Sequence, residues 1–144
     1  MRSPWLGRIA LLSLVGTACA GDGTGVDGGG GVNAGTTLSA DVQPILTANC
    51  ALSGCHAGSD PQQGQNLSAG QTFSNVVNVA SNQLPTMDRV EPGQPDSSYL
   101  VHKIQGTHLQ VGGSGDRMPL ARSPLSQAEI DVIRAWIQAG AMAN

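Results

Sequence analysis

The chain has 144 residues, of which 20 are glycine and only 3% are aromatic. This length corresponds to about one domain, and so few aromatic side chains argue against a large core built from protein alone. The formal net charge of −3 argues against nucleic acid as a partner, because surfaces that bind nucleic acid are basic.

Residues 1–19 have the features of an export signal. Arg2 and Arg8 precede a short apolar run at residues 9–15, which is too short to span a bilayer. Cys19 then follows a Gly-Thr-Ala triplet as a lipoprotein cysteine would, or it lies within an Ala-Cys-Ala cleavage site and is removed. We favour lipidation of Cys19, because an acylated cysteine before a flexible segment would tether the domain to a membrane. Both interpretations predict an exported protein, either periplasmic or membrane-anchored.

Residues 20–37 are predicted to be a flexible linker, since eight of residues 20–36 are glycine. A glycine-rich coil of this length has a root-mean-square reach of roughly 20–25 Å. Such a reach suits a tether, and ordinary N-terminal disorder is the alternative. The folded domain is then expected at residues 38–144.

The first helix of the domain is expected over residues 39–49. Ser39 is placed to cap it, and Asp41 in its first turn complements the helix dipole. Val42, Ile45 and Leu46 lie on one face at helical spacing. This helix is expected to end directly before Cys50.

Two shorter helices are expected in the middle of the domain. Ser68 resembles the start of a capping box that opens a helix through residues 73–77. Asp96 or Ser97 can cap a helix through residues 99–104, with Gly106 as its C-terminal stop. A glycine-rich loop at residues 107–117 then leads to Met118.

The last helix has the clearest signals. Ser126 and Glu129 form a capping box, Leu125 and Ile130 are spaced as a hydrophobic staple, and Gly140 marks the end. The expected buried stripe of this helix is Ile130, Ile133, Trp136 and Ile137. Because no segment has a clear strand pattern, we expect an all-α domain of about four helices with long loops.

Cys50, Cys55 and His56 form the pattern that attaches a c-type haem, two cysteines followed at once by a histidine. Each thiol can add across one haem vinyl group to give a thioether, and the histidine then binds the iron as an axial ligand. Four residues separate the cysteines, whereas two is the usual spacing. Gly54 supplies backbone freedom where this wider loop turns into Cys55. The pattern predicts one covalently attached haem c.

Met118 is the best candidate for the sixth position of an iron held by His56. Pro119 disfavours helix at Met118, because a residue before proline is pushed toward extended conformations. An extended segment can place a methionine sulfur over the open haem face. A histidine–methionine pair raises the reduction potential relative to two histidines and favours electron transfer. Rival ligands from other parts of the chain are Met87, His102 and His108.

Two interpretations without haem stay open for the same residues. Cys50 and Cys55 could form a disulfide, which is common in exported proteins. Alternatively, the two thiols and His56 could bind zinc together with His102 or His108. Paired Cys-x-x-Cys knuckles are absent from the sequence, and exported thiols tend to be oxidised, so neither interpretation explains the motif as well as haem does.

Several features together resemble class I cytochrome c, and most closely its exported bacterial domains. They are Val42 to Leu46 ahead of Cys50 to His56, then Met118-Pro119, then Glu129 to Ile137. The resemblance covers nearly all of residues 38–144. It implies thioethers at Cys50 and Cys55, proximal iron ligation by His56, distal ligation by Met118, and packing of the first helix against the last.

The function implied by this resemblance is that of a monohaem electron carrier rather than an enzyme. A haem-based sensor with an open sixth site is the alternative, followed by a structural domain stapled by a disulfide. Loss of Arg2 and Arg8 would leave five basic residues against ten acidic ones, a net charge of −5. We therefore expect a redox partner with a positive docking patch. Lys103, Arg117 and Arg122 could pair with haem propionates, although solvated surface positions are the simpler interpretation.

Overall fold

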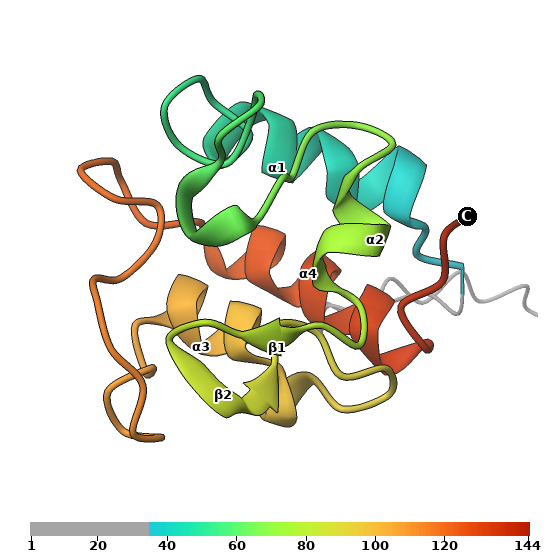
Figure 1. The fold of residues 1–144 in the computed structure, drawn as a ribbon. Helices are drawn as coiled ribbons and strands as arrows, with labels where there is room; N and C mark the ends of the chain where they lie inside the picture. Colours follow the sequence, from blue (N-terminus) through green and yellow to red (C-terminus); the bar gives the residue numbers. More distant parts are fainter. Residues whose placement is uncertain (1–34) are drawn as a thin grey trace, which may run out of the picture.

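The computed structural model describes residues 35–144. Cys19, the expected export signal and most of the expected linker therefore lie outside the described residues. Helices make up most of the regular structure (Figure 1). They are η1, a π-helical turn at Leu38–Val42, α1 at Gln43–Asn49, η2 at Gln62–Gly64, α2 at Thr72–Val76, η3 at Pro95–Ser97, α3 at Tyr99–Gln105 and α4 at Gln127–Gln138.

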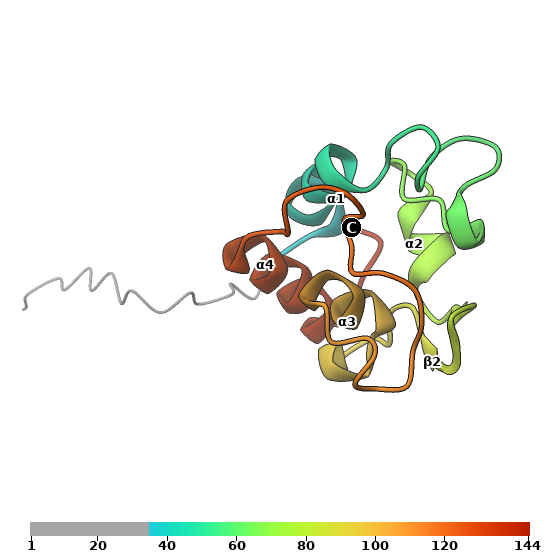
Figure 2. The same ribbon diagram turned by 90° about the vertical axis from the view of Figure 1, so that its left-hand side faces the viewer.

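Helix α4 lies between the first helical segment and α3, as the two views in Figures 1 and 2 show. It contacts η1, η3 and α3. Its expected apolar stripe is confirmed, because Ile130, Ile133, Trp136 and Ile137 are all buried. Fully burying one such side chain contributes about 1.5–3 kcal/mol, so this stripe is a major source of stability for the domain.

The two ends of the described domain are held together beside α4. The backbone N–H of Ser39 donates to the carbonyl of Asn144 at 2.8 Å, and the N–H of Leu38 donates to the Asn144 side chain at 3.1 Å. The C-terminus consequently lies next to the start of η1 in Figure 1. None of the helices within residues 35–144 is long and apolar enough to cross a membrane.

The helix termini confirm some of the expected caps and correct others. Ser126 and Glu129 form the expected capping box of α4, and Gly106 ends α3 in the left-handed conformation with φ of 79°. The expected cap at Ser39 is wrong: Thr37 caps the first helical segment, because its hydroxyl accepts from the N–H of Ala40 and Ser39 already lies inside the first turn.

The predicted starts of the two middle helices are also wrong. Helix α2 begins at Thr72 after Gln71 and lacks a side-chain cap, so Ser68 belongs to the preceding turn. Asp96 and Ser97 lie within η3 rather than capping α3. The residue before α3 is Ser98, whose hydroxyl bonds to the backbone of Glu91 and Gln94 instead.

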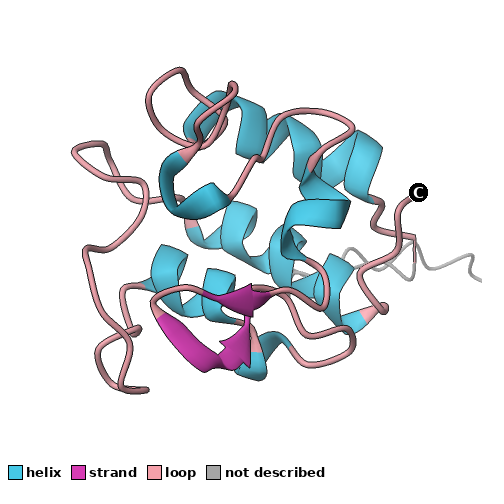
Figure 3. Ribbon diagram, in the orientation of Figure 1, coloured by secondary structure: helices cyan, strands magenta, loops and turns pink. Residues whose placement is uncertain are grey.

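A small antiparallel sheet was not expected from the sequence (Figure 3). Strand β1 spans Ala80–Ser81 and strand β2 spans Leu84–Asp88. The expectation of no strand was wrong because β1 has two residues and β2 lacks alternating burial, which leaves no period of two to detect. Helices are the commonest regular structure of the domain, and its likeness to the cytochrome c fold stays a prediction.

Candidate cofactor pocket

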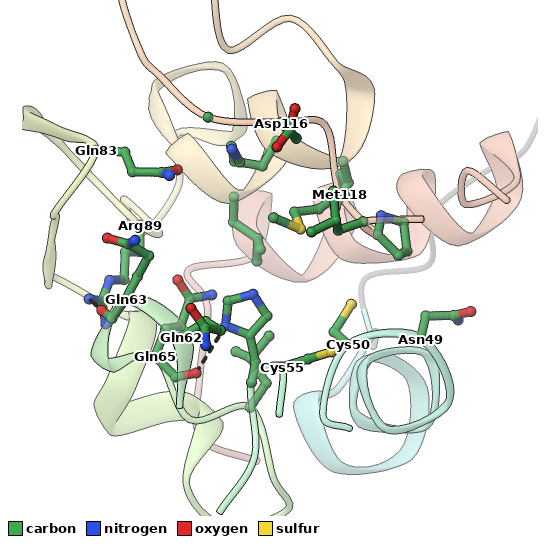
Figure 4. A pocket seen from close by; sticks show the side chains of 18 of the residues that line it. Asn49, Cys50, Cys55, Gln62, Gln63, Gln65, Gln83, Arg89, Asp116 and Met118 are labelled. Atoms are coloured by element: carbon green, nitrogen blue, oxygen red, sulfur yellow. Dashed lines mark hydrogen bonds between the residues drawn. The ribbon is translucent and has the colours of Figure 1, made fainter. Parts of the chain in front are cut away.

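A pocket of about 410 Å³ opens between α1, α3 and the small sheet, and its walls are mostly apolar. This volume falls within the range of about 300–1,000 Å³ for pockets that hold small molecules and cofactors. Cys50, Cys55, His56 and Met118 all line it. Figure 4 shows Cys50 and Cys55 on one wall and Met118 on the facing wall.

The loop after α1 closes on itself through backbone hydrogen bonds. The N–H of Cys55 donates to the carbonyl of Leu52 at 2.9 Å, and the N–H of His56 donates to that of Cys50 at 3.2 Å. Gly54 adopts φ of +78°, a left-handed conformation that favours glycine. The four-residue gap is therefore a compact turn, and it brings both cysteines and the histidine to one side of the pocket.

The two cysteines are free thiols in different environments: Cys50 is buried and Cys55 is exposed. Burial is the main cause that raises the pKa of Cys50 to about 11; the charge of Cys55 acts in the same direction and Arg122 in the opposite one. Because the thiolate is the nucleophilic form, the raised pKa keeps the Cys50 thiol protonated at neutral pH in this form of the pocket. Cys55 is the more accessible of the two sulfurs.

His56 is oriented by the backbone of the loop that follows it. Its Nδ1 lies 3.2 Å from the carbonyl oxygen of Gln65, drawn as a dashed line in Figure 4. A carbonyl only accepts, so Nδ1 carries the proton and Nε2 keeps its lone pair. Burial lowers the pKa of His56, opposed by the hydrogen bond to Gln65. A neutral imidazole with one nitrogen fixed in this way is the usual form of a metal ligand.

Met118 reaches the pocket from the loop that follows α3. Its backbone N–H donates to the carbonyl of Lys103 at 3.0 Å, which ties the segment around Met118 directly to that helix. As expected from Pro119, Met118 is not helical. The loop is also held by Tyr99, whose hydroxyl bonds to both the N–H and the carbonyl of Ser114. Helix α3 thus sets the position of the methionine.

The three other candidates for the sixth iron position lie outside this pocket. Both ring nitrogens of His102 are hydrogen-bonded, to Thr107 and to the carbonyl of Asp96. His108 is buried under the loop, where its Nε2 bonds to the carbonyl of Gly115 at 2.8 Å. Neither histidine lines the pocket, nor does Met87, which borders a separate surface depression. Of the four candidates, Met118 is the one that faces the thiols and His56.

The zinc interpretation gains no support from the described part of the chain. Within residues 35–144, histidine, cysteine and acidic side chains form no group of three that could hold a metal ion. His102 and His108 do not line the pocket that Cys50, Cys55 and His56 line.

Arg89 lines the pocket and was not expected there from the sequence. This side chain is only 6% exposed, and its guanidinium bonds to backbone carbonyls at positions 14 to 26 residues away. No local pattern signals such burial, because the carbonyls come from distant segments. Lys103 and Arg122, two of the expected propionate partners, also line the pocket, whereas Arg117 bonds to the carbonyl of Ile104 outside it.

The residues of this pocket suit a haem chemically. Two thiols on one wall match two vinyl groups, and a neutral imidazole facing a thioether sulfur matches the axial positions of an iron. The mostly apolar walls match the faces of a macrocycle.

Comparison with known proteins finds no similar protein family, no similar curated protein and no similar solved structure.

Proposed function

We propose that this protein is an exported monohaem c-type cytochrome that carries single electrons between redox partners. The observation that supports this most is the convergence of Cys50, Cys55, His56 and Met118 on one pocket. Met118 is far from the other three in sequence, so the haem-attachment motif alone does not account for its position.

Each residue has a distinct role in the proposal. Cys50 and Cys55 would hold the haem by adding to two vinyl groups: the S–C bond would form, the C=C bond would become single, and the thiol hydrogen would move to the neighbouring carbon. His56 would hold the iron through Nε2, with Nδ1 held by the carbonyl of Gln65. Met118 would supply its thioether sulfur as a second protein ligand. The bound haem supplies reversible one-electron iron chemistry.

The protein environment favours electron transfer over substrate chemistry. Met118 would fill the iron position that small molecules could otherwise take, and the mostly apolar walls would limit the access of water to a bound haem. A methionine ligand raises the reduction potential relative to a second histidine. No residue needs to turn over a substrate, so the protein acts as a carrier or as the electron-entry module of a larger oxidoreductase.

The proposed setting is outside the cytoplasm, with Cys19 as a lipid anchor. The acidic net charge favours a partner with a positive docking patch, and the association rate is then expected to fall as salt is added.

Replacement of Met118 tests the ligand assignment. Met118→Ala should leave haem covalently attached, lower the reduction potential and let carbon monoxide bind the reduced protein rapidly. Met87→Ala is the matched control, because Met87 lies outside the pocket; it should change neither property. Rapid carbon monoxide binding to the wild-type protein would instead indicate an open sixth position and a ligand-binding or sensing function.

A further inference from the structure

The residues proposed to hold the haem lie on two facing walls of the pocket. The histidine wall is the loop at residues 50–65, which carries both thiols and His56, and the methionine wall is the segment at residues 107–118, which ends at Met118. Among residues 35–144, no observed hydrogen bond joins one wall directly to the other. A hydrogen-bonded connection across the pocket therefore has to run through another segment.

The turn between β1 and β2 is a segment that reaches both walls. It consists of Asn82 and Gln83, which both line the pocket. The Nδ2 of Asn82 donates to the carbonyl of Gln63 in the histidine wall at 2.9 Å. On the other side, the hydroxyl of Ser114 in the methionine wall donates to the carbonyl of Gln83 at 3.4 Å. Two adjacent residues of one turn thus contact both walls.

The contact with the methionine wall includes close packing as well as the hydrogen bond. A Cβ built on Gly115 would lie 2.5 Å from Nε2 of Gln83, so the Gln83 side chain lies directly against the Gly115 backbone. The turn itself is held by Ser81, a buried residue whose hydroxyl accepts from the N–H of Gln83 at 3.2 Å. In Figure 4, Gln83 lies between Asp116 and Gln63, away from the thiols.

The contact with the histidine wall leads to the histidine ring. Gln63 adopts φ of +58°, a left-handed conformation that is uncommon for residues other than glycine. Its carbonyl accepts hydrogen bonds from Asn82 and from the buried Arg89. Two residues later in the chain, the carbonyl of Gln65 orients Nδ1 of His56. Asn82 is therefore bonded to the short segment that orients the imidazole.

We propose that Asn82 and Gln83 are positioning residues that hold the methionine wall to the histidine wall across the pocket. For the iron, this inference rests on the proposed function: haem is attached to the histidine wall, so Met118 stays a ligand only while the methionine wall stays close. The hairpin turn limits the movement of that wall. Its two links act in series, because Asn82 reaches one wall and Gln83 reaches the other.

Two substitutions each remove one of the links. Asn82→Ala removes the bond to Gln63, and Ser114→Ala removes the bond to Gln83. Both positions are exposed, so we expect both variants to fold, which far-UV circular dichroism checks. Ser114→Ala also keeps the backbone bonds of residue 114 to the hydroxyl of Tyr99, so the loop stays tied to α3.

The rate of carbon monoxide binding to the reduced holoprotein reports how often Met118 leaves the iron. Loss of one exposed hydrogen bond should raise this rate by about two- to tenfold in each single variant. Because the links act in series, the double variant should match the single variants. Rates that multiply in the double variant would mean that the two residues act independently, and unchanged rates in both single variants would mean that the turn does not hold the walls; either result overturns the proposal.

Gln138→Ala is the matched control. Gln138 also uses an exposed side-chain amide to reach a distant backbone carbonyl, that of Gly93 at 3.2 Å, and it does not line the pocket. This substitution should leave both carbon monoxide binding and the reduction potential unchanged, whereas Asn82→Ala should lower the potential as Met118 ligation weakens. An equal effect of the two substitutions would show a general loss of stability and would overturn the positioning role.

Hydrogen exchange separates this proposal from the proposed function, because it needs no haem. In the full chain prepared without haem, Asn82→Ala should speed exchange of the amides in the methionine wall by about two- to tenfold, although Asn82 does not bond to that wall. Faster exchange in a protein that never attaches haem would retain the bridge and remove the cytochrome. Covalent haem with unchanged exchange and unchanged carbon monoxide binding would retain the cytochrome and remove the bridge.

Discussion

Arg89→Lys is the substitution whose effect can be worked out most directly from the structure. Lysine keeps the positive charge but lacks the planar fork that joins two segments, one at Gln63 and the other at Asn75. Two short charge-assisted bonds are worth about 3–6 kcal/mol. An ammonium can retain one of them, so we expect a loss of about 1.5–3 kcal/mol in the free energy of unfolding.

Urea unfolding followed by far-UV circular dichroism measures this difference. A loss of that size is a large fraction of the roughly 5–15 kcal/mol that stabilises a typical domain. Arg122→Lys, at an exposed position, should change the free energy of unfolding by less than about 0.5 kcal/mol. If Arg89→Lys were as stable as the wild-type protein, the guanidinium would not be joining the two segments. The claim that Arg89 is held rigidly in the pocket would then have to be abandoned.

Two further predictions concern local conformation and pH. Gly54→Ala should destabilise the protein by about 1–2 kcal/mol in thermal unfolding, because φ of +78° is unfavourable for alanine. The cost should come from the backbone alone, since no atom lies within 4 Å of the added Cβ. Glu129→Gln should lower the stability at pH 7, because hydrogen bonds from Ser126 lower the pKa of Glu129; solvent screening of this solvent-accessible carboxylate keeps the expected loss below about 1 kcal/mol. A carboxyl group whose pKa is lowered in the folded state stabilises the fold at pH values above its ordinary pKa. This stabilisation is lost as the pH falls through the lowered pKa of the folded state.

Each of these predictions has a clear contrary result. Unchanged stability of Gly54→Ala, compared with Ser53→Ala as the neighbouring control, would mean that the turn between the cysteines relaxes freely. For Glu129, a difference between wild type and variant that persisted at pH 2.5 would show that its carboxylate charge does not stabilise α4.

The parts of the fold that follow from local rules were predictable from the sequence. The capping box at Ser126, the buried stripe of α4 and the stop at Gly106 depend on residues within a few positions of one another. Strand β1 was missed because its pairing with β2 depends on contacts and not on a repeated pattern. Thr37 was missed as a cap because Ser39, two residues later, satisfies the same composition rule.

Some residues of the candidate site were likewise predictable from local sequence, and others were not. The motif at Cys50 and His56 is visible in the sequence, and so is the extended character that Pro119 imposes on Met118. Which of four rival ligands faces the motif depends on how the loop after α3 is tied to Lys103, a contact that no local pattern encodes. Arg89 was invisible for the same reason, since its hydrogen-bond acceptors lie far away in the chain.

The central claim is that Cys50 and Cys55 hold a haem covalently. The most direct measurement is a pyridine haemochrome spectrum of the full chain, exported in cells that contain haem maturation factors, after denaturation and acid–acetone extraction. We predict that haem stays with the protein and gives the spectrum of two thioether bonds, and that Cys50→Ser with Cys55→Ser releases it. A colourless wild-type protein, or haem that extracts freely, would contradict the claim.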